Sequence, residues 1–320
     1  MISAAPDTVR IDPPTPRIEW VTCALAVAVY ASWMLGVAAM TTGFGGLATV
    51  ALIVACCWYM SLQHELIHGH PTRSKPINRL IGLAPLAVWY PYDIYRSGHL
   101  AHHRDETLTQ PGIDPESNYI EADAYEALPA WMRPLWVVQR TALGRMLVGP
   151  ALVIVPTWLD IVRKPLRGDF SEMRVWTLHL AMLAALLFAL DRFAGISPLL
   201  YMFGIAYPAV GLAMLRSFHE HRPARAPAHR VVINEAGFGW RLLFLNNNYH
   251  SVHHENPSMP WYRMRSAYLA DRAGYLHRNG GFLVAGYGTL LRRFAVSPID
   301  SPIHPPLSST GPMSARASSL

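Results

Sequence analysis

The sequence predicts an all-α integral membrane protein, with two transmembrane helical hairpins and a cytosolic helical cap that holds a histidine-rich site for two metal ions. Three observations lead to this prediction. Hydrophobic residues make up 52% of the 320-residue chain and charged residues only 15%, against roughly 25% charged residues in soluble proteins. Four apolar segments are long enough to cross a bilayer, which takes about 20 residues. Most of the 15 histidines gather in short clusters beside these segments.

The four predicted spans pair into hairpins because the connections inside each pair are short. "TTG" joins the first span to the second, and "DRFAG" joins the third to the fourth. The spans cover about residues 20–40, 44–62, 175–190 and 196–215. Two further apolar segments are expected to form in-plane or re-entrant helices instead: 147–159, which is short and has two prolines, and 77–92, which ends in aromatic residues.

The basic residues predict the orientation of the chain in the membrane. Of the 27 Lys and Arg residues, the short turns inside the hairpins contain only Arg192. By the positive-inside rule, the histidine clusters and both termini face the cytosol. Topology therefore accounts for the formal net charge of +6. The sequence has no basic-aromatic module of the kind that binds nucleic acid, and no nucleic-acid partner is expected.

The ends of the chain differ in composition from its middle. Residues 1–18 form a polar, proline-rich tail without the pattern of a signal peptide, and residues 297–320, rich in Pro and Ser, are expected to be disordered. Residues 19–296 are expected to form one membrane domain. The three cysteines, Cys23, Cys56 and Cys57, fall in predicted spans, so a disulfide framework or a zinc-cysteine site is not expected.

Histidines recur at spacings of three and four residues, which on a helix share one face. "HELIH" contains His64 and His68, "HLAHH" contains His99, His102 and His103, and "HSVHH" contains His250, His253 and His254. "FHEH" adds His219 and His221 at the end of the fourth span; residues two apart do not face each other, and His221 is the favoured one of the pair. His70 is left open, while the isolated His179, His229, His277 and His304 are expected to be structural.

"HELIH" also fits H-E-x-x-H, the zinc-peptidase pattern in which the glutamate is the general base. A catalytic zinc takes about three protein ligands, whereas the clusters together offer eight or nine histidines, enough for two metals. A zinc peptidase is therefore a remote alternative. Imidazole suits zinc, copper, iron or nickel, so the ligand type does not choose the metal. A non-catalytic membrane protein that binds metal is a third hypothesis.

Three histidine boxes in this order, interleaved with two transmembrane hairpins, resemble the integral-membrane fatty acid desaturase and hydroxylase family. The resemblance covers roughly residues 20–265. It extends beyond the histidines to "WYPYDIYRSGHLAHHRDE" and "NNNYHSVHHENPSMPWY".

The resemblance implies a non-haem di-iron centre that activates O₂ with two electrons from a separate ferredoxin or small cytochrome. It implies eight iron ligands: His64, His68, His99, His102, His103, His250, His253 and His254. His221 matches an additional ligand that the family places after its fourth span, and Asn247 or Asn248 matches a residue that holds a water near one iron.

An apolar lipid or acyl chain is the expected substrate, and desaturation is the first choice of reaction because three compact boxes and a short tail after the third match desaturases best. A hydroxylase or ketolase of a lipid, alkane or carotenoid is the alternative. Acidic residues beside the boxes are candidates for orienting the imidazoles through their outer ring nitrogens. Glu65 and Glu220 are the leading candidates, and Asp105, Glu106 and Glu255 are the others.

Overall fold

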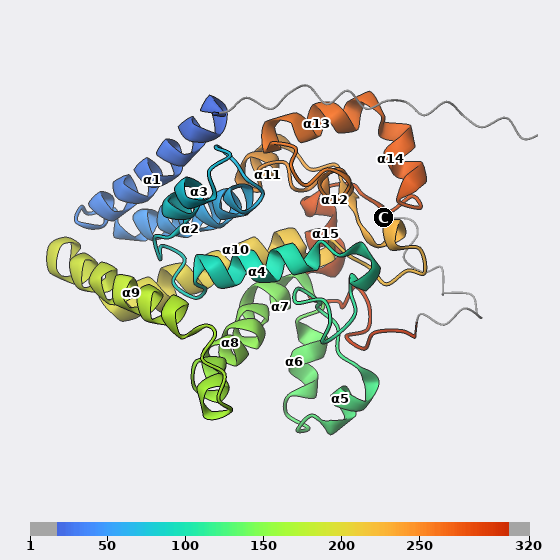
Figure 1. The fold of residues 1–320 in the computed structure, drawn as a ribbon, viewed down its shortest axis with the longest axis horizontal. Coiled ribbons are helices and arrows are strands. Elements are labelled where there is room, and N and C mark those ends of the chain that lie inside the picture. The colour runs from blue at the N-terminus through green and yellow to red at the C-terminus, as the bar shows by residue number, and fades with distance from the viewer. Residues whose placement is uncertain (1–17, 307–320) are drawn as a thin grey trace, which may run out of the picture.

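The computed structural model describes residues 18–306, and most of the expected N-terminal tail, together with residues 307–320, lies outside the described residues. The described chain is mostly helical (Figure 1). Its helices are α1 (Trp20–Met40), α2 (Gly45–Ile67), α3 (Lys75–Gly82), α4 (Tyr92–His102), α5 (Ala122–Ala127), α6 (Arg133–Val138), α7 (Ala142–Leu147), α8 (Gly149–Leu166), α9 (Met173–Ala194), α10 (Tyr207–Arg216), α11 (Phe238–Leu243), α12 (His250–Glu255), α13 (Trp261–Ala270), α14 (Arg272–Arg278) and α15 (Tyr287–Phe294).

Shorter elements connect these helices. Three are 3₁₀ turns and one is a π-helical segment: η1 (Asp105–Thr107), η2 (Leu200–Ala206), η3 (Ser217–His219) and η4 (Pro227–Arg230). Strands β1 (Ile233–Asn234) and β2 (Leu283–Val284) pair in parallel, with Ile233 opposite Leu283. The π-helical segment runs directly into α10, and together they form the expected fourth apolar segment.

Five helical segments are long and apolar enough to cross a membrane, where the sequence predicts four: Trp20–Met40, Gly45–Ile67, Ala142–Leu166, Met173–Ala194 and Leu200–His219. They fit a multi-pass membrane protein. The additional one joins α7 and α8, and helix α8 continues seven residues beyond the expected 147–159 segment. Pro150 stands in its first turn, where no backbone N–H is needed, and Pro156 lies inside the helix without ending it. Figure 1 shows α8 running across the direction of α10.

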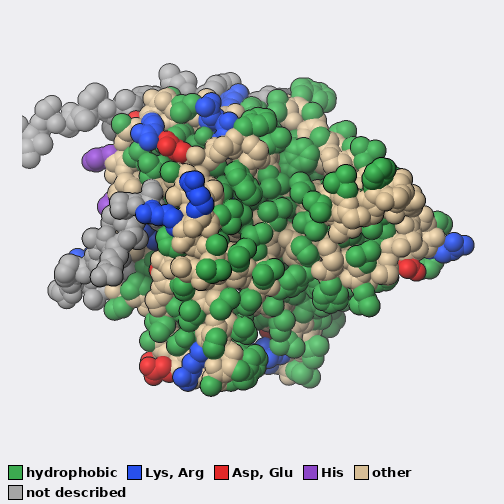
Figure 2. All heavy atoms as spheres, turned by 180° about the vertical axis from the view of Figure 1, so that it is seen from behind, with side chains coloured by type: hydrophobic (Ala, Val, Ile, Leu, Met, Phe, Trp, Pro, Cys, Tyr) green, Lys and Arg blue, Asp and Glu red, His purple; other side chains and the backbone are tan. Residues whose placement is uncertain are grey.

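Large apolar side chains are exposed along these helices. Trp20, Leu35 and Phe193 expose 74%, 71% and 78% of their surface. Figure 2 shows hydrophobic side chains spread over most of one face, with the charged side chains mainly at its edges. Water-soluble monomers seldom expose contiguous apolar patches larger than a few hundred Å². This surface suits contact with lipid.

The segment 77–92, expected to form an in-plane or re-entrant helix, is helical only at its beginning. Only Lys75–Gly82 is helical, and the chain then continues without regular structure to Pro91, the residue before α4. Pro85 and Pro91 explain the interruption, because the residue before a proline is disfavoured in helical geometry. The non-helical stretch fills the interior between helices, where Leu86, Val88 and Trp89 are buried.

The first part of the segment expected to be disordered is held against the rest of the chain. Asp300 forms an ion pair with Arg140, and Ile303 forms an isolated bridge with Ile120. Residues 299–304, which fall in the tail expected to be disordered from Ser297, thus have specific partners in the structure: a buried guanidinium and the backbone of Ile120.

Helices α7 and α10 cross in close contact at a glycine. A Cβ atom at Gly211 would lie 2.2 Å from the carbonyl oxygen of Met146, closer than non-bonded atoms approach. The contact atom is backbone, so it cannot move aside as a flexible side chain would. The absent side chain at Gly211 lets α10, which leads to His219 and His221, lie against α7.

We predict that Gly211→Ala destabilises the protein by about 1–3 kcal/mol, the usual cost of adding a carbon to a filled interior. Thermal unfolding in mild detergent measures the change. Gly288→Ala is the matched control, because a Cβ atom there meets nothing within 4 Å. Equal melting temperatures for the two variants would contradict the close crossing.

Candidate metal centre

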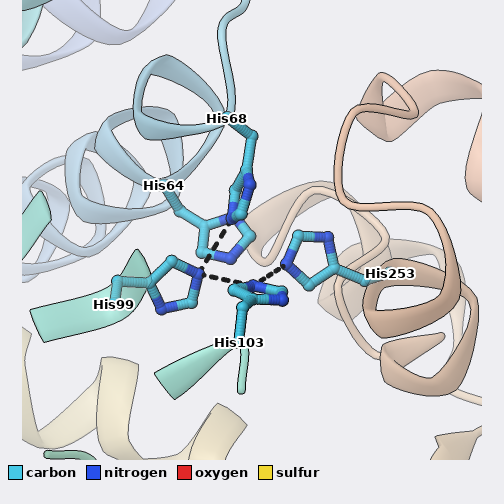
Figure 3. A group of neighbouring side chains, drawn as sticks. All are labelled: His64, His68, His99, His103 and His253. Carbon is cyan, nitrogen blue, oxygen red and sulfur yellow. Dashed lines mark hydrogen bonds between the residues drawn. The ribbon is translucent and has the colours of Figure 1, made fainter. Parts of the chain in front are cut away.

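Nine histidines converge in two neighbouring groups. Within each group, one ring nitrogen from every histidine lies within 4.8 Å of those from the others. The first group, drawn in Figure 3, contains His64, His68, His99, His103 and His253. The second group contains His102, His221, His250 and His254. All nine candidate ligand residues predicted from the sequence are thus brought together.

Most of these histidines lie at or beside the ends of helices that meet at one place. His64 lies in the last turn of α2, His99 and His102 in the last turn of α4, and α12 begins at His250. His68 and His103 each directly follow the helix that carries their box. Because α2 and α4 end at the place where α12 begins, residues more than 180 positions apart in the sequence share one site.

Each H-x-x-H-H box divides its histidines between the two groups, whereas the sequence argument expects one box to aim at one point. His99 and His103 join the first group and His102 joins the second; His253 joins the first and His254 the second. The reason is helical geometry. Residues four apart share a face, but adjacent residues point about 100° apart around the helix axis.

The ring nitrogens face one another at hydrogen-bonding distance. In the first group, the Nε2 atoms of His99 and His68 are 2.9 Å apart, those of His103 and His99 3.1 Å, and those of His253 and His103 3.0 Å. In the second group, the Nε2 atom of His221 is 3.0 Å from that of His102 and 3.1 Å from that of His250. A neutral imidazole has one lone pair, and a cation at the centre of each group can accept all of them.

Burial keeps most of these imidazoles neutral. It lowers the pKa of His103 to about 3, and the neighbouring His99 and His102 add to this shift. Burial and the adjacent imidazoles also hold the pKa values of His253 and His254 well below the ordinary range. The neutral ring is the form that binds a metal. The neutral histidines can therefore coordinate a metal ion without first losing a proton.

His102 differs because two carboxylates lie beside it. Burial lowers its pKa, but the charges of Glu116 and Asp114 outweigh burial and raise the pKa to about 9. A metal that binds the ring must therefore displace a proton. The same carboxylates that hold this proton also favour a metal cation in its place.

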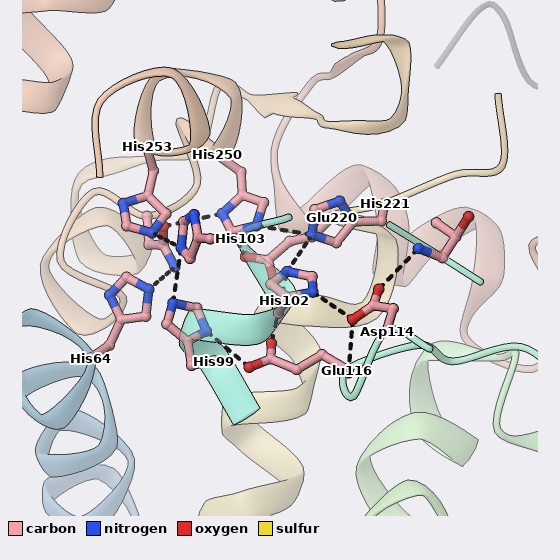
Figure 4. A network of polar contacts seen from close by, with 12 residues as sticks. His64, His99, His102, His103, Asp114, Glu116, Glu220, His221, His250 and His253 are labelled. Carbon is pink, nitrogen blue, oxygen red and sulfur yellow. Dashed lines mark hydrogen bonds and ion pairs between the residues drawn. The ribbon is translucent and has the colours of Figure 1, made fainter. Parts of the chain in front are cut away.

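Asp114 and Glu116 are the partners that sequence reasoning missed. Glu116 Oε1 is 2.8 Å from His99 Nδ1, and Asp114 Oδ1 is 2.8 Å from His102 Nδ1 (Figure 4). A carboxylate on Nδ1 fixes the proton there and leaves Nε2 free to bind a metal. Each acid serves a different group. The two acids lie in "DPES" on an irregular loop, where no periodicity connects them to the box; their only signal is proximity in sequence to "HLAHH".

Glu65 and Glu220, the leading candidates from the sequence, are buried but lie beyond hydrogen-bonding distance of the histidines. Glu65 Oε2 accepts a hydrogen bond from the backbone N–H of Trp261, the first residue of α13, and Oε1 is 3.8 Å from His64 Nδ1. Glu220 Oε1 accepts from Arg216 Nη1 at 2.7 Å and is 3.7 Å from His250 Nδ1. Their nearest strong partners are thus a helix start and a guanidinium.

The other polar candidates from the sequence have different partners in the structure. Asn247 connects the groups, with Oδ1 3.1 Å from His250 Nδ1 and Nδ2 3.5 Å from His64 Nε2. Asn248 instead donates to the carbonyl of Asn234. Glu255 is paired with Arg278, and Glu106 contributes its backbone carbonyl to a hydrogen bond with Arg230. The side chain of Asp105 lies outside what the structure describes.

The remaining histidines lie outside both groups. His219 packs on Phe282, with ring centroids 4.9 Å apart, whereas His221 joins the second group. His70 is hydrogen-bonded to Glu19, with 2.7 Å between Nδ1 and Oε1. His179 contacts the carbonyl of Val88, and His304 contacts Thr109. His229 lies beneath Gly280, and His277 lies in the last turn of α14.

The donor set fits first-row transition metals. Five imidazoles in one group and four in the other offer nitrogen ligands of the type that iron, zinc, copper and nickel accept. Each group has fewer than six donors, so an octahedral ion would keep at least one position for another ligand. Carboxylates that accept hydrogen bonds from the Nδ1 atoms of His99 and His102 complete the pattern expected around metal-binding histidines.

Comparison with known families agrees with this geometry. The model of the fatty acid desaturase family matches residues 31–282, which include all nine histidines and the loop with Asp114 and Glu116. The chain belongs to the fatty acid desaturase family. No curated protein matches its sequence. Family membership and the two histidine groups together indicate an oxidoreductase of the desaturase and hydroxylase type.

We predict that Asp114→Asn weakens metal binding by about 10- to 100-fold, the usual effect of losing a carboxylate behind a ligating histidine. The amide keeps the shape of the side chain but removes the charge beside His102. Competition with a chelator in mild detergent measures the affinity. Asp123→Asn on α5 is the control, and an equal affinity in both variants would show that Asp114 does not support the site.

Proposed function

We propose that this protein is an O₂-dependent desaturase that introduces a C=C bond into the acyl chain of a lipid or thioester at a centre of two iron ions. The observation that carries the proposal is the division of nine histidines, six of them buried and three partly buried, into two adjacent groups of five and four. One metal site would need about three ligands. A pair of groups with outer carboxylates suits two metals that act together.

Iron bound in both groups would supply the activation of O₂ that breaking an unactivated C–H bond requires, which ordinary side chains cannot provide. The residues of the chain have other tasks. The nine histidines would hold the two ions, Glu116 and Asp114 would orient His99 and His102, and Asn247 would connect the groups. The buried surroundings would limit the access of water to the reacting carbon.

The proposed substrate and partners follow from the membrane setting. An apolar acyl chain would reach the site from the bilayer, in line with the apolar, exposed surfaces of the long helices. Two electrons would come from a separate ferredoxin or small cytochrome. The distribution of Lys and Arg supports a cytosolic position for the histidine groups and for both termini. We propose one catalytic domain that extends from residue 19 to residue 304, eight residues beyond the boundary expected from composition.

Metal analysis and product analysis test the proposal together. Protein purified after growth with ample iron should contain two irons per chain. Incubation with an acyl lipid, O₂ and a reduced ferredoxin should give a product lighter by two hydrogens. A product heavier by one oxygen would replace desaturation with hydroxylation, and a chain with one zinc and no iron would overturn the di-iron assignment.

We predict that His102→Ala and His253→Ala each lower iron content and activity together, with activity falling more than about 100-fold, beyond the usual effect of changing an outer partner. The two variants remove a ligand from different groups. Iron per chain and substrate turnover are measured on the same samples. His277→Ala is the control, since His277 lies in α14 outside both groups.

We predict that Glu65→Gln keeps its iron and loses less than about tenfold in activity, because the amide oxygen can still accept the hydrogen bond of Trp261 that the carboxylate accepts now. A zinc peptidase would instead lose its general base and all hydrolysis. The measurement compares iron content, desaturation and cleavage of a casein substrate in the variant and the parent. Peptide cleavage abolished by Glu65→Gln would restore the peptidase interpretation.

A further inference from the structure

We propose that residues 299–304, here called the C-terminal strap, hold the loop that orients His99 and His102, and that His304 and Asp300 are positioning residues for the metal centre. The proposal rests on the proposed function only where it speaks of bound metal. The loop in question comprises residues 109–120 and carries Asp114 and Glu116. The strap contacts this loop near both of its ends.

One end of the strap is attached through a buried guanidinium. Asp300 Oδ1 accepts from Arg140 Nε at 2.6 Å, and Asp300 Oδ2 accepts from the hydroxyl of Tyr119 at 2.7 Å. The guanidinium of Arg140 also lies over the Tyr119 ring, 4.4 Å from its centroid. Arg140 exposes only 2% of its surface, so its charge needs a carboxylate partner. Asp300 thus fixes the end of the loop at Tyr119.

The other end of the strap pairs with the loop through backbone and side-chain contacts. The carbonyl of Pro302 accepts from the N–H of Ile120, and the N–H of His304 donates to the carbonyl of Ile120, both at 2.9 Å. His304 Nε2 is 3.0 Å from Thr109 Oγ1. The strap therefore joins residues 109 and 120, between which the two carboxylates lie.

Thr109 is held in an unusual conformation at the beginning of this loop. Its φ angle is +71°, in the left-handed region that β-branched residues rarely adopt. Its N–H donates to Asp114 Oδ2 at 2.9 Å, and its hydroxyl contacts His304. Such a conformation persists only where the surroundings fix it. The contact with His304 is one of these fixing interactions.

A series of three contacts therefore leads from the strap to the metal centre: His304 to Thr109, Thr109 to Asp114, and Asp114 to His102. Glu116 and His99 are one step further away, because the N–H of Glu116 donates to Asp114 Oδ1. Loss of the contact between His304 and Thr109 should therefore loosen the second group, which contains His102, more than it loosens the first group.

Prolines within and directly after the strap, at positions 302 and 305, restrict the conformations of the unfolded chain. They therefore lower the entropy that is lost when the strap becomes ordered.

The test compares His304→Ala with His304→Gln in the full chain loaded with iron. Glutamine can place an amide near the position of the imidazole Nε2, whereas alanine cannot reach Thr109. Two quantities are measured: amide hydrogen exchange of residues 109–116, and the rate at which a chelator removes each iron. His277→Ala is the matched control, a histidine in α14 away from the loop.

In His304→Ala we expect amide exchange in residues 109–116 to rise at least about tenfold and one of the two irons to leave about tenfold faster, in the range of outer-partner effects. His304→Gln should restore both quantities to near the parent values. Exchange and release equal to those of His277→Ala would overturn the proposal. If His304→Ala does not fold, Asp300→Asn provides the same comparison, with faster exchange at residues 114–120 expected and unchanged exchange contradicting the strap.

The outcomes separate this inference from the proposed function. A parent protein with two irons and unchanged exchange in His304→Ala would refute the strap and leave the desaturase assignment standing. A parent protein without iron, in which His304→Ala still accelerates exchange of residues 109–116, would support the strap and refute the di-iron assignment.

Discussion

The close packing of nine imidazole rings at one largely buried site is the constraint on which the rest of the structure depends. Ring nitrogens that face one another at about 3 Å have too few protons between them to satisfy every lone pair, unless a cation replaces those protons. The protein holds this arrangement by ending three helices at one point and by fixing Nδ1 of two rings with carboxylates. The close crossing at Gly211 lets α10, which leads to His221, approach the same point.

Spacing along the sequence was enough to predict eight of the nine histidines that lie together. A separation of three or four residues places side chains on the same side of a helix, so the members of the three boxes could be found without a structure. Which histidines of different helices share a group depends on where α2, α4, α12 and the segment after α10 meet, and no spacing contains that information. The helical rule stated only that His219 and His221 do not share a face and did not choose between them; His221 was the favoured one and matched the family resemblance, and the structure brings it into the second group beyond a 3₁₀ turn.

The acidic residues illustrate a limit of reasoning from neighbours in sequence. Glu65 follows His64 directly, and adjacent residues on a helix point about 100° apart, so an acid beside a ligand is turned away from it. The carboxylate that supports a ligand must come from another segment, as Asp114 and Glu116 do. Irregular loops such as 109–116 have no periodic signal. The same absence of periodicity explains why composition alone suggested disorder at residues 299–304, whose partners lie about 160 to 195 positions earlier.

The division of each H-x-x-H-H box between the two groups connects the groups through the backbone. His102 and His103 are consecutive residues, as are His253 and His254, and each pair serves both groups. The two groups are therefore linked through neighbouring residues, whose side chains point about 100° apart around a helix axis. The two boxes tie the groups together twice, once at the end of α4 and once in α12, so a change elsewhere in the protein can alter the surroundings of the groups without separating them.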